Sequence, residues 1–167
     1  MKILLTGAAG TLGSRILLPL RELPGYTIRV LEHESAVQMN KVERAQGDLL
    51  ELNSLEDACR GIDAVMHLAA ATRTRKSNRY FAVNCEGTRN LVTACERCGV
   101  SRFIYLSSAT ATAKHDGGAY AQSKKLGEEI VRKSVLDWTI VRPSEVYGSE
   151  SSEGLGGLIA LIQRSHF

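Results

Sequence analysis

A tyrosine and a lysine four positions apart have types and spacing suited to acid–base chemistry. Tyr120 and Lys124 begin a segment whose apolar residues recur at helical intervals, so both side chains are expected on one helix face. An ammonium group beside a phenol favours the phenolate and lowers the tyrosine pKa toward a range useful for proton transfer. Ser108, which follows an apolar run, would hold a substrate oxygen against the tyrosine hydroxyl. This trio would give or take a proton at a hydroxyl or carbonyl group, although the tyrosine–lysine spacing also occurs by chance on surface helices.

A glycine-rich turn near the start of the chain predicts a phosphate site. A short apolar run enters the turn, glycines stand at Gly7, Gly10 and Gly13, and helical apolar spacing follows. Glycine permits positive φ and close approach of a ligand, and the free N–H groups of a first helical turn bind phosphate or pyrophosphate. The G-x-x-G-x-x-G spacing differs by one residue from the general dinucleotide fingerprint. A plain strand-to-helix turn therefore stays open unless a βαβ unit and an acid follow.

The residues after the glycine turn predict both the βαβ unit and the acid. The pattern predicts a helix over residues 11–23, ended by Pro24 and Gly25, and then a strand over residues 26–31. Glu32 follows that strand about 20 residues after the turn, where a dinucleotide fold places an acid on the ribose hydroxyls. A solvated charge is the other interpretation of Glu32. With a dinucleotide bound, a nicotinamide would exchange hydride at the carbon whose oxygen the trio protonates or deprotonates.

The remaining chain alternates strands with helices. Residues 64–70 and 102–106 are almost wholly apolar, as in parallel strands covered on both sides. Helices are expected near residue 53 onward, over 79–98 and from residue 120. The pattern predicts an α/β, Rossmann-type doubly wound parallel sheet with helices on both faces. The carboxyl ends of such strands form the ligand edge, which here would hold the glycine turn, Glu32, Asp48, Ala69, Ala70 and Ser108.

Other polar or reactive residues point to structural roles or leave two interpretations open. His67 lies inside an apolar strand and is expected to be packed rather than catalytic. Cys95 and Cys98 have C-x-x-C spacing but no second cysteine pair or nearby histidine, so no metal site is expected. Residues 72–79 carry four positive charges. They form either a solvated loop or a contact for a phosphorylated or nucleotide-linked substrate.

Composition bounds the class of protein. The chain has 167 residues, 44% hydrophobic residues and a net charge of +3, typical of one globular domain. The charge is too small to indicate a nucleic-acid partner, and no apolar run is long enough for a membrane span. No secretory signal is visible and four cysteines are too few for a disulfide scaffold. We therefore expect a cytoplasmic protein with a small-molecule substrate.

Several motifs occur together along nearly the whole chain. They are TGAAGTLG at residues 6–13, GDL at 47–49, HLAA at 67–70, NCEGTRNL at 84–91, two serines at 107–108, YAQSK at 120–124 and VRPSEVYG at 141–148. In these motifs the sequence resembles the extended short-chain dehydrogenase/reductase superfamily, and within it the NAD-dependent epimerase/dehydratase family.

The resemblance implies a cofactor and a set of site residues. The implied catalytic trio is Ser108, Tyr120 and Lys124, and the implied cofactor is NAD. An acid at position 32 would repel the 2′-phosphate of NADP, whereas Arg15 and Arg29 leave NADP open. The implied cofactor contacts are Gly7, Gly10, Thr11, Leu12 and Gly13 at the pyrophosphate, Glu32 at the ribose, Asp48 and Leu49 at the adenine, and Leu68, Ala69, Ala70, Tyr120, Lys124, Pro143 and Ser144 on the nicotinamide side.

The implied function is an NAD(P)-dependent epimerase/dehydratase or oxidoreductase acting on a sugar nucleotide or another hydroxyl or carbonyl substrate. The alternative is a non-catalytic NAD(P)-binding sensor or assembly module. Eleven residues separate Ser108 from Tyr120, fewer than is usual in sugar-nucleotide epimerases, which indicates a shorter-looped relative.

The resemblance also bears on domain organisation and assembly. Chains of the family normally continue into a substrate lobe. We therefore expect residues 1–167 to form one NAD(P)-binding Rossmann domain, with residues beyond about 149, including a helical-looking stretch over 155–164, beginning a truncated lobe. The helices expected over 79–98 and 120–133 would pair in a homodimer, as in relatives.

Overall fold

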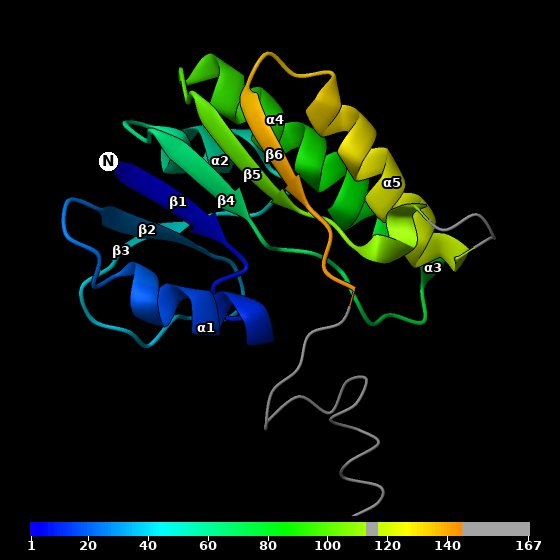
Figure 1. Cartoon of the computed structure of the whole chain (residues 1–167), viewed down its shortest axis with the longest axis horizontal. Helices are drawn as coiled ribbons and strands as arrows, with labels where there is room; N and C mark the ends of the chain where they lie inside the picture. The colour runs from blue at the N-terminus through cyan, green and yellow to red at the C-terminus, as the bar shows by residue number, and fades with distance from the viewer. Residues whose placement is uncertain (113–116, 145–167) are drawn as a thin grey trace, which may run out of the picture.

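A parallel sheet forms the centre of the fold (Figure 1). The computed structural model describes residues 1–112 and 117–144. Their strands are β1 (Lys2–Thr6), β2 (Thr27–Glu32), β3 (Glu43–Gln46), β4 (Ala64–His67), β5 (Arg102–Leu106) and β6 (Asp137–Val141). All neighbours pair in parallel in the order β3-β2-β1-β4-β5-β6. The order reverses direction between β1 and β4, so the predicted doubly wound Rossmann fold is confirmed.

Helices cover both faces of the sheet, as predicted. They are α1 (Thr11–Leu20), α2 (Leu52–Cys59), α3 (Ser77–Phe81), α4 (Thr88–Arg97) and α5 (Gly118–Arg132), with a π-helical turn η1 (Ala82–Gly87) and a 3₁₀ turn η2 (Ala109–Thr112). Figure 1 shows α1 on one face and α2, α4 and α5 on the other. Among the described residues, no helix is long and apolar enough to cross a bilayer.

Alternating strand side chains build a separate core on each face. The core under α2, α4 and α5 includes Leu4, Val65, Phe103, Leu91 and Val131. The core under α1 includes Ile3, Leu5, Val30 and Leu17. Burial on both faces explains why β1 and β4 are apolar at consecutive positions.

Two strands have no clear signal in the sequence. β3 is a polar Glu-Arg-Ala-Gln segment at the edge of the sheet, held to β2 partly by an ion pair between Arg29 and Glu43. β6 is the other edge strand of the described sheet, and most of its residues are exposed. An edge strand needs no continuous apolar run, so periodicity does not reveal it.

Helix boundaries also differ from expectation. The first helix ends at Leu20 rather than at residue 23, one residue after Pro19, which cannot donate to the preceding turn. The helix predicted over 79–98 is a run of α3, η1 and α4. The widened η1 turn holds Asn84, whose side chain bonds the backbone of Ala71. The predicted stretch over 155–164 and the lobe beyond about 149 lie outside the described residues.

The glycine turn after β1 provides a test of packing. A Cβ atom at Gly13 would overlap the carbonyl oxygen of Gly7, whereas one at Gly10 would lie 3.2 Å from that oxygen. We expect Gly13→Ala to lower the free energy of unfolding by about 3 kcal/mol and Gly10→Ala by about 1 kcal/mol or less. Urea unfolding of the two variants measures the difference. Equal losses would contradict the crowding seen at Gly13.

Candidate active site

A cavity of about 880 Å³ opens along the carboxyl ends of the central strands. It is lined by every site residue predicted from the sequence except Glu32, namely Gly7, Gly10, Thr11, Leu12, Gly13, Asp48, Leu49, Leu68, Ala69, Ala70, Ser108, Tyr120, Lys124, Pro143 and Ser144. Parallel strands bring these distant segments to one edge. The fold therefore places the glycine turn and the candidate acid–base residues around one space.

The glycine turn has the backbone geometry of a phosphate cradle. Gly7 has a φ of +74°, and its carbonyl accepts a hydrogen bond from the Gly10 N–H at 3.0 Å. Gly10 precedes α1 without capping it through a side chain. The N–H groups of the first turn of α1 are thus left for a ligand, and the positive end of the helix dipole favours an anion there. These residues fit the pyrophosphate of a dinucleotide.

Glu32 lies at the predicted position, but its carboxylate is turned away from the cavity. The side chain is 4% exposed and accepts hydrogen bonds from the Val37 N–H at 2.7 Å and from Gln46 at 2.9 Å. Arg44 lies 3.4 Å from the same carboxylate. Glu32 therefore anchors the loop that follows β2, and its ribose contact stays a prediction.

The residues after Glu32 line the cavity in its place. They are His33, Glu34 and Ser35, which sequence reasoning missed. The only available signal was their position directly after a strand of the ligand edge. His33 also lies 3.3 Å from Asp48, whose other carboxylate oxygen accepts the Leu50 N–H at 2.9 Å. Asp48 is thereby held at the border of the cavity, and its contact with an adenine stays a prediction.

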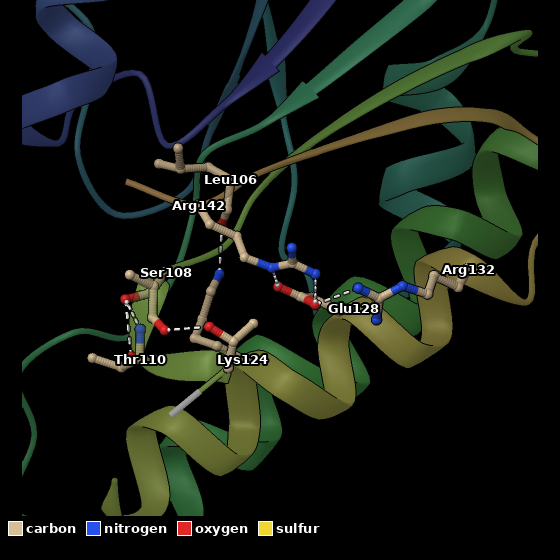
Figure 2. Close-up of polar contacts among 9 residues, drawn as sticks. Leu106, Ser108, Thr110, Lys124, Glu128, Arg132 and Arg142 are labelled. Atoms are coloured by element: carbon tan, nitrogen blue, oxygen red, sulfur yellow. Dashed lines mark hydrogen bonds and ion pairs between the residues drawn. The ribbon is translucent and has the colours of Figure 1, made fainter. Parts of the chain in front are cut away.

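The candidate acid–base residues come from the segment after β5 and from α5, and Figure 2 shows Ser108 and Lys124. The Ser108 hydroxyl accepts a hydrogen bond from the Thr110 hydroxyl at 2.9 Å. The Lys124 ammonium donates to the Leu106 carbonyl at 2.7 Å and lies 4.3 Å from the centre of the Tyr105 ring. The Tyr120 ring packs edge-on against the Tyr80 ring, with 5.8 Å between the two ring centres.

The sequence-based reasoning expected the Lys124 ammonium beside the Tyr120 phenol. In the structure this ammonium is bonded to the Leu106 carbonyl, so its effect on the Tyr120 pKa stays a prediction. Burial lowers the pKa of Lys124 to about 8, and the nearby negative charge of Glu128 offsets part of that loss.

Comparison with known proteins identifies the family. The NAD dependent epimerase/dehydratase family matches residues 3–166. The chain belongs to this family. Sterol demethylase protein B of Methylococcus capsulatus is 34% identical to this chain. The matched region covers 89% of this chain and 52% of the sterol demethylase protein. The chain spans about half the length of the curated relatives it matches.

Two solved structures are also similar to this family member. A short-chain dehydrogenase/reductase superfamily protein from Agrobacterium tumefaciens with bound NAD is 31% identical, with a TM-score of 0.73 over 85% of this chain and 48% of that chain. MoeE5 in complex with UDP-glucuronic acid and NAD is 25% identical, with a TM-score of 0.85 over 99% of this chain and 62% of that chain.

A buried histidine links the glycine strand of this family member to α4. The hydroxyl oxygen of Thr6 lies 2.7 Å from His67 Nδ1, and that of Thr88 lies 3.1 Å from His67 Nε2. The Thr88 hydroxyl donates to the Asn84 carbonyl at 2.8 Å, so Nε2 carries the proton and Nδ1 accepts from Thr6. Burial, followed by the charge of Lys124, lowers the pKa of His67 to about 3. His67 is packed and neutral, as the sequence predicts.

Asn84 supports the other side of the cavity and was not singled out from the sequence. Its amide bonds both backbone groups of Ala71, at 2.8 and 3.1 Å, and donates to Ser123 at 2.9 Å. The Ser123 hydroxyl donates in turn to the Tyr120 carbonyl at 2.7 Å. Asn84 thus joins the segment after β4 to the first turns of α5.

His67 predicts a specific pH dependence of stability. Its folded pKa of about 3 lies below the ordinary value of 6.5, so below pH 6.5 the unfolded chain takes up a proton that the folded chain refuses. We expect the free energy of unfolding to fall through this residue with a slope that grows from about 0.7 kcal/mol per pH unit at pH 6.5 toward about 1.4 kcal/mol per pH unit near pH 5.

Urea unfolding at pH 7, 6 and 5 measures this slope. His67→Asn should remove it, whereas His33→Asn, at an exposed histidine, should keep it. Equal slopes in His67→Asn and the wild type would show that His67 is not the group responsible.

Proposed function

We propose that this chain binds NAD at the carboxyl edge of its sheet and carries the acid–base residues of an epimerase/dehydratase or oxidoreductase. The observation that carries the proposal is the shared cavity, in which the glycine turn faces the same space as Ser108, Tyr120 and Lys124. The NAD bound to the Agrobacterium tumefaciens protein and to MoeE5 supports the cofactor assignment.

Different residues of the chain would bind different parts of NAD. The first turn of α1 would hold the pyrophosphate together with Gly7, Gly10 and Gly13, and Asp48 and Leu49 would border the adenine. Glu34, which lines the cavity beside His33, would place a negative charge there that favours NAD over NADP. Of the two arginines that left NADP open, Arg29 is committed to Glu43 and to the carbonyls of Ala58 and Arg60.

The chemistry would run on the opposite side of the cavity. Bound NAD supplies a hydride acceptor. Ser108 would hold the substrate oxygen and Tyr120 would exchange the proton of that hydroxyl or carbonyl group. Lys124, which is buried and cationic near neutral pH, would favour the ionised form of Tyr120 and bond the nicotinamide ribose.

We propose a sugar nucleotide as the substrate class. The UDP-glucuronic acid bound to MoeE5 supports it, as does the basic segment bordering the cavity. No acidic residue occurs between Asp63 and Glu86, while Arg73, Arg75, Lys76 and Arg79 all fall in that interval.

We also propose a homodimer paired through α4 and α5, and a cytoplasmic location. Cys59, Cys85, Cys95 and Cys98 are free thiols, which fits a reducing compartment.

Binding and turnover test the proposal separately. The wild type should bind NAD in calorimetry, and absence of both NAD and NADP binding would refute the proposal. Tyr120→Phe should retain NAD binding but lower turnover of UDP-glucuronic acid about 100-fold or more, because it removes the proton-exchanging hydroxyl. Tyr26→Phe, at an exposed tyrosine outside the cavity, is the matched control. A wild type that binds NAD but shows no turnover would favour a non-catalytic NAD-binding sensor or assembly module.

Arg79 tests the substrate class. It lines the cavity, and none of the side chains in the described part of the chain pairs with its guanidinium. With NAD present, Arg79→Gln should weaken UDP-glucuronic acid binding about tenfold, equivalent to about 1.4 kcal/mol, and leave NAD affinity unchanged. Lys76→Gln, in the same segment but outside the cavity lining, should bind like the wild type. Calorimetry that finds no difference between the two variants would exclude Arg79 as an anion contact.

A further inference from the structure

Glu128 ties α5 to the end of β6 through a buried carboxylate one helical turn after Lys124 (Figure 2). Its Oε1 accepts a hydrogen bond from Arg142 Nε at 2.7 Å, and its Oε2 accepts one from Arg142 Nη2 at 2.7 Å. Two parallel bonds between a guanidinium and a carboxylate fix both distance and orientation. Arg132, on α5 itself, donates a third bond to Oε2 at 2.7 Å.

In this cluster the carboxylate is buried and the two guanidinium groups are partly exposed. The Glu128 side chain is 3% exposed, while those of Arg132 and Arg142 are 39% and 35% exposed. Burial opposes ionisation of Glu128, but hydrogen bonds from Arg142 and Arg132 outweigh it and lower the pKa of the carboxyl to about 2. The pair therefore stays charged across the physiological range.

Arg142 connects the pair to the cavity through the backbone. It directly precedes Pro143 and Ser144, which line the cavity, whereas neither Arg142 nor Glu128 does. The backbone holds this end of β6 to β5 through Ser107 N–H to Val141 and Ala109 N–H to Pro143, at 2.7 and 3.0 Å. Those bonds fix the turn against the sheet, and the Glu128–Arg142 pair fixes it against the helix that carries Lys124.

We propose that the Glu128–Arg142 pair is a positioning device that sets the gap between the turn at Pro143 and Ser144 and the Lys124 side of the cavity. This inference rests on the proposed NAD binding and adds a determinant of where the nicotinamide ring lies. Glu128 and Arg142 act through the residues beside them and touch no ligand themselves.

The chain offers a matched pair of variants. Arg142→Gln and Arg132→Gln each remove one guanidinium from the same carboxylate, but only Arg142→Gln removes the hydrogen bonds between α5 and the residue that follows β6. Fluorescence of bound NADH at saturation reports the surroundings of the nicotinamide. The dissociation constant of ADP-ribose, measured by calorimetry, reports the rest of the site.

The expected result separates the two arginines. In Arg142→Gln, the fluorescence enhancement of bound NADH should fall at least about twofold while ADP-ribose affinity stays within about twofold of the wild type. Arg132→Gln should match the wild type in both measurements. Arg142→Lys keeps a positive charge beside Glu128 but loses the second bond, so its NADH fluorescence enhancement should lie between those of Arg142→Gln and the wild type. It also serves as the test if Arg142→Gln does not fold.

Three results would overturn the inference. The first is unchanged NADH fluorescence in Arg142→Gln and Arg142→Lys. The second is an equal change in Arg132→Gln, which would show that charge balance rather than the tie to β6 matters. The third is a parallel loss of ADP-ribose affinity, which would indicate a general structural role. A wild type that binds neither NADH nor ADP-ribose would refute the proposed function and this inference together.

Discussion

The close approach of the Gly7 turn to its neighbours is the constraint on which the site depends. A Cβ atom at Gly7 would collide with the backbone at Leu68 and Ala69, and one at Gly13 would collide with Gly7 itself. Only glycine lets β1 end so near the exit of β4 while α1 starts directly behind the turn. This contact brings the uncapped end of α1 to the same edge as the segment after β4, where a dinucleotide could span both.

Polar side chains under that edge hold it together, and of these Thr6 also lines the cavity. His67 joins β1 to α4 through Thr6 and Thr88, and Asn84 joins the segment after β4 to α5. Buried polar groups are stable only when each donor and acceptor is satisfied. These bonds therefore connect β1 and the segment after β4 to the helices α4 and α5.

The sequence was informative where burial or backbone strain demands particular residue types. Apolar strands, the glycine turn and the order of Ser108, Tyr120 and Lys124 were enough to predict the fold, and the residues predicted for the site make up about half of the cavity lining. Polar edge strands such as β3 gave no signal, because one neighbour and an exposed face impose no pattern. The direction of the Glu32 carboxylate was also out of reach, since it depends on Val37 and Gln46, which only the folded chain brings near.

The fold alone does not determine which substrate a protein of this family binds. Relatives named for a sterol and structures holding UDP-glucuronic acid match much the same part of this family's chain. The fold that these proteins have in common therefore carries no information about the substrate. What discriminates must be side chains that reach the cavity without supporting the sheet. Arg79, the proposed anion contact, lines the cavity beside Ala82 and Val83. A cationic side chain at the border of a cavity favours an anionic ligand over a neutral one.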